Sequence, residues 1–175
     1  MKLPNPCPFE KTSPKQAFGI EPHRFGCCRV QSALLRNEPP MCRLRETESE
    51  GYRFLWTSSF NGSALVHIAR RGDLIELRSR VLGRSRLYRK EPVISSTLPP
   101  DDWETLQRAL TISNFWSLDA TDDRIGLDGE HGLIEGQRGD TYHWVERWCP
   151  QGAVHDLGRL FILLAGPALA DITIY

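Results

Sequence analysis

The sequence predicts an α+β fold: an antiparallel sheet of about five strands with two amphipathic helices packed on one face, in the order β-β-β-α-β-β-α. Apolar and polar residues alternate between positions 52 and 82, which indicates a three-stranded meander. A second alternating pair of segments lies at 133–148. A segment with helical spacing of apolar residues follows each group of strands. With 175 residues, the chain is long enough for one such domain, which we place at residues 51–175.

The first 50 residues differ from this pattern. Prolines interrupt every short apolar stretch, and residues 43–50 form a polar run. We therefore expect an irregular N-terminal arm over residues 1–50. The arm carries four of the five cysteines, without the paired spacing of a zinc site, and the sequence has neither a signal peptide nor an apolar run that approaches a membrane span. These features favour a reduced, cytoplasmic protein without a membrane contact.

Turn signals divide the meander into strands. Asn61-Gly62 is typical of a two-residue hairpin turn, because both residues tolerate positive φ. Gly72-Asp73 predicts the next turn. We expect strands at 52–60, 64–70 and 74–82, and residues 92–98 either add an edge strand or serve as a connection.

The first helix is predicted to begin after Pro99-Pro100. Asp101 is expected to cap it, with Glu104 at the spacing of a capping box. One apolar face then includes Trp103, Leu106, Leu110 and Phe115. A second helix is predicted from Ala153 to a C-cap at Gly166, which Pro167 follows.

Between the helices, residues 133–137 and 141–148 are predicted to form a second hairpin around Arg138-Gly139. A two-residue turn there pairs Glu135 with Tyr142 and Ile134 with His143. Glu135 and His143 then lie on opposite faces of the sheet. Tyr142, Trp144, Glu146 and Trp148 share a face with Glu135.

Acidic and histidine side chains before and within this hairpin suggest one function, a metal-dependent hydrolase using residues 122–143. Its weak metal site would consist of Asp128, His131 and His143. The predicted register argues against it, because the hairpin's polar groups do not converge. No nucleophile elbow, dinucleotide-binding motif or phosphate loop occurs, so we assign no catalytic residue and no cofactor.

The charge distribution suggests a second alternative. The net charge is zero, but residues 1–90 hold 17 Lys and Arg against 8 Asp and Glu, and residues 91–175 hold 5 against 14. Basic residues between Arg70 and Lys90 could follow a phosphate backbone. The residues for such nucleic-acid binding are Arg84, Arg86, Tyr88 and Arg89. The neutral total makes pairing between the two halves the simpler interpretation.

Three short motifs carry a family resemblance. Gly132-Leu-Ile-Glu-Gly136, Tyr142-His-Trp-Val-Glu-Arg-Trp148 and Pro150, with the apolar helix up to Gly166, resemble a family of small soluble bacterial domains of unknown function. The resemblance covers about residues 52–166. It implies the fold and a bacterial origin, and it assigns no role to Glu135, His143 or Arg147.

The interpretation that the residues favour is a non-enzymatic domain that binds or modulates another protein. Tyr, Trp and Arg are the residue types enriched at binding hot spots, and we expect the sheet face not covered by helices to expose them. The candidate binding residues are Tyr142, Trp144, Arg147, Trp148, Glu135 and His143. The identity of the protein partner and the oligomeric state are left open.

Overall fold

The computed structural model describes residues 35, 38, 41, 50–59, 62–82, 92–124, 126, 128–170, 172 and 174. Its element order is β-β-β-β-α-β-β-α, which confirms the α+β class. The strands are β1 (Glu50–Ser58), β2 (Ser63–Arg71), β3 (Leu74–Leu82), β4 (Ile94–Thr97), β5 (Glu130–Arg138) and β6 (Thr141–Trp148). The helices are α2 (Pro100–Ile112) and α3 (Gly152–Ala165), with short 3-10 helices η2 (Phe115–Ser117) and η3 (Gly166–Leu169).

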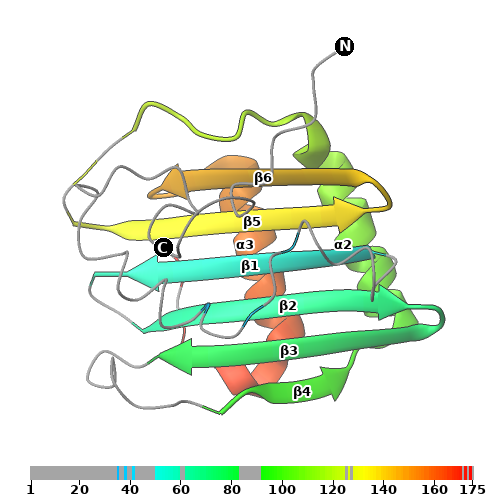
Figure 1. Cartoon of the computed structure of the whole chain (residues 1–175). Coiled ribbons are helices and arrows are strands. Elements are labelled where there is room, and N and C mark those ends of the chain that lie inside the picture. The colour runs from blue at the N-terminus through cyan, green and yellow to red at the C-terminus, as the bar shows by residue number, and fades with distance from the viewer. Residues whose placement is uncertain are drawn as a thin grey trace.

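The strands form one antiparallel sheet in the order β4-β3-β2-β1-β5-β6. It has six strands instead of about five, because residues 94–97 pair with β3 as an edge strand. Both α2 and α3 cover the same face of the sheet (Figure 1). We call that side the helix face and the opposite side the far face.

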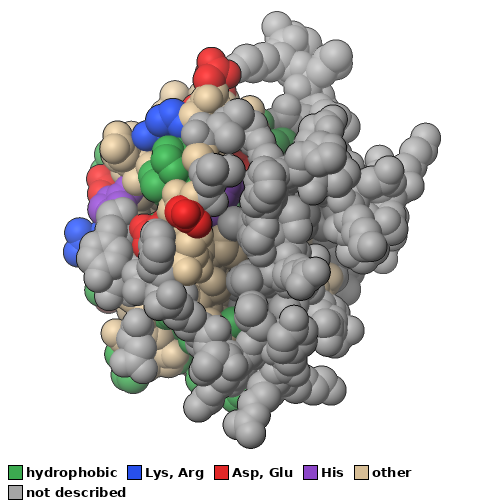
Figure 2. Space-filling model, turned by 90° about the vertical axis from the view of Figure 1, so that its left-hand side faces the viewer, with side chains coloured by type: hydrophobic (Ala, Val, Ile, Leu, Met, Phe, Trp, Pro, Cys, Tyr) green, Lys and Arg blue, Asp and Glu red, His purple; other side chains and the backbone are tan. Residues whose placement is uncertain are grey.

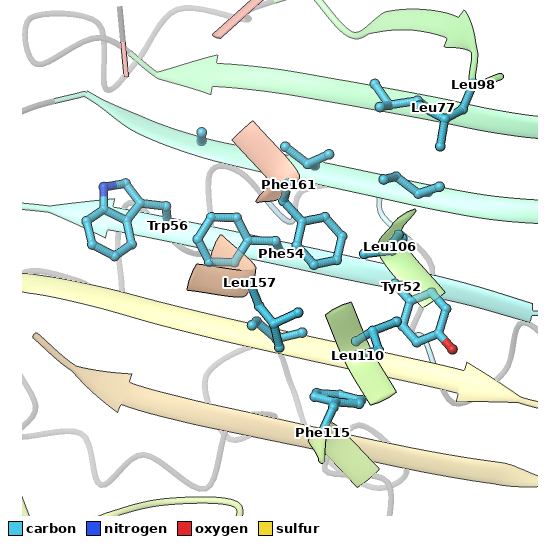
Figure 3. Packing of buried hydrophobic residues seen from close by; sticks show 14 of the residues in the cluster. Tyr52, Phe54, Trp56, Leu77, Leu98, Leu106, Leu110, Phe115, Leu157 and Phe161 are labelled. Carbon is cyan, nitrogen blue, oxygen red and sulfur yellow. The ribbon is translucent and has the colours of Figure 1, made fainter. Parts of the chain in front are cut away.

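Alternation along β1 divides its side chains between the two faces. Tyr52, Phe54 and Trp56 point to the helix face and are at most 1% exposed. They form the core with apolar residues of both helices, as Figure 3 shows for Leu106, Leu110, Leu157 and Phe161. Phe54 stacks on Phe161 with ring centroids 5.6 Å apart. Residues 53 and 55 point to the far face.

The start of α2 differs from the expectation. Asp101 does not cap the helix: Pro99 is the N-cap, and no side chain bonds there. Pro100 takes the first helical position, where its fixed φ suits the helix and its missing N–H costs nothing. Asp101 falls in the first turn, where its charge is favourable at the positive end of the helix dipole. The predicted stripe of Trp103, Leu106 and Leu110 is buried.

The second helix and its C-cap are confirmed, with Gly166 at φ 61°. We expected no apolar segment to approach the length of a membrane span. One helical stretch does reach that length and hydropathy, judged by length and composition only. Gly152–Leu169 is an 18-residue helical stretch with a mean hydropathy of 1.2, of which 33% is buried. Its stripe of Val154, Leu157 and Phe161 packs on the sheet, which accounts for much of its apolar composition.

The turns set the register of the hairpins. Gly72-Asp73 is confirmed, because Arg71 pairs with Leu74. In the second hairpin the turn is Gly139-Asp140 instead of Arg138-Gly139, since glycine meets the positive φ of 55° at position 139. Glu135 therefore pairs with Trp144, two residues from the predicted partner. A shift of two preserves the predicted faces. Asn61 lies outside the described residues.

Candidate binding site on the far face

A row of mostly polar side chains crosses the middle of the far face. Arg78, His67, Arg53, Glu135 and Trp144 stand directly opposite one another on β3, β2, β1, β5 and β6. We call these five residues the central row. The registers place them side by side, because directly opposite residues of paired strands share a face.

The centre of this row is a buried ion pair. Arg53 Nε and Nη2 lie 2.7 Å and 2.6 Å from Glu135 Oε2, and both side chains are 1% exposed. The hydroxyl of Tyr142 donates to the other carboxylate oxygen, Oε1, at 2.9 Å. Each oxygen of Glu135 thus has a donor. A buried charge is stable only with this kind of compensation, so the three residues act as one unit.

Tyr142 is held in its protonated form. Burial raises the pKa of its hydroxyl far above the ordinary value, and the negative charge and hydrogen bond of Glu135 raise it further. At neutral pH the hydroxyl is therefore a donor to Glu135 and cannot accept a proton in acid–base catalysis. In this arrangement the tyrosine orients the carboxylate of Glu135.

The neighbouring pair fixes a histidine tautomer. His67 Nδ1 lies 2.6 Å from Arg78 Nη2. A guanidinium has only N–H donors, so Nδ1 accepts this hydrogen bond and the ring proton resides on Nε2. Arg78 thus supplies positive charge at the β3 end of the central row, whereas the charge of Arg53 is compensated by Glu135.

Beside the central row the far face is apolar. Leu55, Leu65, Leu82 and Leu133 form a second small core, each at most 4% exposed. Leu35 from the N-terminal arm packs against this core, as does Trp144. Arg80 lies opposite Leu65 at the border of the apolar area.

Three residues of the arm contact this face at intervals of three. We call these three residues, Leu35, Glu38 and Met41, the docked segment. Leu35 meets the leucine core, Glu38 Oε1 lies 3.3 Å from Arg80 Nη2, and Met41 packs against Tyr142 and Trp144. Met41 is 0% exposed. The contacts thus extend across the sheet from Arg80 on β3 to the aromatic residues of β6.

The structure brings together three of the six candidate binding residues: Glu135, Tyr142 and Trp144. The expectation that they are exposed is wrong for two of them, because Glu135 is 1% and Tyr142 7% exposed. His143 points to the helix face, where its ring centre lies 5.2 Å from that of Phe115. It is buried and does not share a surface with the others.

Arg147 and Trp148 hold the connection that precedes β5. Arg147 donates to the backbone oxygens of Asp119 and Ala120 at 2.8 Å and 3.2 Å. This guanidinium was expected to be available to a partner, but it is occupied by carbonyl groups of the chain itself. Trp148 lies so close to Gly126 that a Cβ there would come within 1.9 Å of its ring.

The residues of the metal alternative are separated. Asp128 is exposed, His131 lies 3.2 Å from Glu146 on the far face, and His143 is on the helix face. Within the described part of the chain, no three His, Cys, Asp or Glu residues are placed to hold a metal ion. The structure therefore does not bring these three residues together as a metal site.

The nucleic-acid alternative depends on Arg84, Arg86, Tyr88 and Arg89, which all lie outside the described residues, as do Cys7, Cys27, Cys28 and Cys42. Of the basic residues that the structure does describe, Arg70 lies over the ring of Trp103, 5.5 Å from its centre. On the described part of the surface in Figure 2, acidic, basic and histidine side chains are interspersed.

Sequence reasoning missed Arg53, His67 and the docked segment, and it considered Arg78 only as one of the basic residues between Arg70 and Lys90. For the three strand residues, the available signal was their position between apolar neighbours in segments whose two faces are both buried. For the segment, the signal was the spacing of Leu35, Glu38 and Met41. Neither signal identifies these residues as neighbours unless the pairing of β1 with β5 is known.

Comparison with known proteins adds no relative: no family model, curated protein or solved structure matches the chain.

Proposed function

We propose that this protein is a non-enzymatic binding domain whose far face receives a short segment of a partner protein. The segment has an acidic residue flanked at three positions on either side by an apolar residue. The observation that carries the proposal is the docked segment, in which Leu35, Glu38 and Met41 contact a leucine core, Arg80 and an aromatic pair.

The surface supports recognition of such a segment because its positions are chemically distinct. The leucine core favours an aliphatic side chain, and Arg80 favours an acid. Tyr142 and Trp144 accept the flexible side chain of a methionine. The Arg53–Glu135 pair beneath them holds Tyr142 in place without offering a reactive group.

The strength of the contacts is compatible with exchange. Burial of one methionine contributes about 1.5–3 kcal/mol. The Glu38 and Arg80 side chains are only 6% and 13% exposed, so the cost of removing their charges from water offsets most of their attraction, and the pair adds little net stability. A tethered segment competes at an effective concentration in the millimolar range. A partner with the same pattern and additional contacts can therefore replace it.

A peptide with the sequence of residues 33–43 tests the proposal. Labelled peptide is titrated by fluorescence anisotropy into the full chain and into a Leu35→Ser/Met41→Ser variant, whose own segment is weakened. We expect the variant to bind the peptide at least about tenfold more tightly than the wild type, because the loss of two apolar contacts removes the competitor.

Charge reversal supplies the matched control. In the Leu35→Ser/Met41→Ser background, Arg80→Glu should abolish binding of this peptide and permit binding of a peptide with lysine at the position of Glu38. Trp144→Ala should weaken binding, whereas Arg108→Glu, on the exposed side of α2, should not. Equal binding by the Arg80→Glu variant and its parent would contradict the proposal.

Photo-crosslinking then addresses the partner. A photoreactive residue in place of Trp144 should capture, in cells of the source organism, a protein whose crosslinked peptide carries an acid with apolar residues three positions away. Capture confined to residues 35–41 of the chain itself would show that the face serves only to hold its own arm.

A further inference from the structure

The two edge strands of the sheet, β6 and β4, differ in whether other parts of the chain cover their outer backbone groups. At β6, the backbone N–H of Glu146 donates to the oxygen of Ala120 at 2.7 Å, and Arg147 binds the same connection. This connection runs beyond β6 in Figure 1. At the opposite edge, all four residues of β4 are exposed. Only the β4 edge can therefore add another strand without displacing part of the described chain.

The hydrogen bonds of β4 show which of its backbone groups point outward. Leu98, just after the strand, donates its N–H to the oxygen of Ile75, so this directly opposed pair is a hydrogen-bonded one. Hydrogen-bonded pairs alternate along an antiparallel ladder. The backbone groups of Ser96 and Ile94 therefore face β3, and those of Ser95 and Thr97 face away from the sheet.

The side chains of this edge do not oppose pairing. Natural edges are blunted by short length, charges, prolines or bulges. β4 is short, but its sequence Ile-Ser-Ser-Thr has no charge and no proline. Val93 and Ile94 are 44% and 45% exposed. Leu74, at the start of β3, is 53% exposed. An uncharged edge flanked by exposed apolar residues favours a strand that is itself uncharged.

We propose that β4 pairs with β4 of a second copy of this chain, antiparallel about a two-fold axis at Ser96. This register places Ser95 opposite Thr97 of the second copy in both directions, and each such pair exchanges two backbone hydrogen bonds. Ile94 lies opposite Leu98 of the second copy, and the two Ser96 residues face each other. The strand is thus complementary to itself, and the two sheets continue as one.

A four-residue strand forms a small interface, so the dimer is weak and depends on concentration. Sedimentation equilibrium of the full chain over a wide concentration range should show reversible dimerisation. Ser95→Pro removes an outward N–H twice per dimer and leaves the bonds to β3 intact, so we expect at least about tenfold weaker association. Ser95→Ala is the matched control and should associate like the wild type.

Charge pairs test the register and do not depend on a proline. Ser95→Lys/Thr97→Lys and Ser95→Glu/Thr97→Glu should each be monomeric, because like charges oppose each other across the axis. Mixing the two should restore a dimer containing one copy of each, which salt weakens. A wild-type chain that is monomeric at every concentration overturns the proposal. So does a dimer that neither the proline nor the charge variants weaken.

Discussion

Arg53 and Glu135 form an ion pair that is 1% exposed on both sides, although 82 residues separate them in the chain. The pair joins β1 to β5, and thereby the meander to the second hairpin. Its carboxylate also accepts the hydroxyl of Tyr142 on β6. The far face is therefore organised around one carboxylate that three strands share.

Breaking this pair from one side should be costly. We expect Arg53→Met and Glu135→Leu each to lower the free energy of unfolding by about 3–5 kcal/mol, because the remaining charge stays buried without its partner. The double variant should recover about 2–3 kcal/mol of the summed loss. Urea denaturation of the four proteins measures this coupling, and strictly additive losses would contradict the pairing.

The buried side chains of Tyr52 and Tyr142 should make the protein sensitive to alkali. Burial raises the pKa of Tyr52 and Tyr142 above the value of about 10 that both have in the unfolded chain, and Glu50 and Glu135 raise it further. Below pH 10 both states retain the proton, and the stabilising contribution is complete. Above it only the unfolded chain ionises, so stability falls by about 1.4 kcal/mol per pH unit for each tyrosine.

Tyr142→Phe and Tyr52→Phe should each flatten this alkaline slope in urea denaturation between about pH 9 and pH 11. Phe161→Leu is a suitable control, because it removes core volume beside Phe54 without changing a titrating group. It should lower the stability at every pH and leave the slope unchanged. An equal slope in the wild type and both phenylalanine variants would exclude the tyrosines as its cause.

The sequence pattern predicted the strand at 74–82, the helix stripe of Trp103, Leu106 and Leu110, and the C-cap at Gly166, because each is set by local spacing or backbone conformation. It also predicted that Glu135 and Tyr142 share a face. The shift of the turn by one residue moved the pairing by an even number, which preserves the face.

The composition of the far-face site could not be predicted in this way. Alternation assigns Arg53 to a face but does not reveal which strand lies beside β1, and the partner strand β5 begins more than 70 residues further on. The docked segment is harder still, since Leu35, Glu38 and Met41 are held by tertiary contacts and belong to no strand or long helix. Arg147 was assigned to binding because arginine is enriched at binding hot spots, and its carbonyl partners could not be foreseen, since they lie in a loop without periodicity.

An unpartnered hydroxyl in the core offers a stabilising substitution. Ser79 is 1% exposed, and its Oγ has no hydrogen-bond partner within the described part of the chain. We expect Ser79→Ala to raise the free energy of unfolding by roughly 1 kcal/mol, because the desolvation cost of the hydroxyl disappears. Ser63→Ala is the contrasting case, since Ser63 Oγ accepts the backbone N–H of Ser58 at 3.3 Å, and it should lower stability. Thermal unfolding distinguishes the two, and a loss with Ser79→Ala would contradict the assignment.

Gly136 permits the close approach of two aromatic rings. A Cβ at this position would lie 2.8 Å from Phe115 Cε1 and 3.0 Å from Tyr52 Cε1. Gly136→Ala should therefore destabilise the protein by about 1–3 kcal/mol through overpacking. Combining it with Phe115→Leu should cost less than the two separate losses together, because the smaller side chain makes room. A neutral Gly136→Ala in chemical denaturation would show that the rings can move aside.

Arg147 should act as a tie between β6 and the connection beside it. Its guanidinium binds the backbone oxygens of Asp119 and Ala120, and Ala120 also accepts the N–H of Glu146. Replacement by alanine leaves these oxygens without that donor, so we expect faster hydrogen exchange at residues 119–124 and at the Glu146 amide, with little change in β2.

Arg147→Lys, which cannot reproduce the planar fork of donors, should restore only part of the protection. Trp144→Ala, on the opposite face of β6, should leave the exchange of this connection unchanged. If Arg147→Ala exchanged like the wild type at these positions, the contacts of the guanidinium would not be what holds the connection in place.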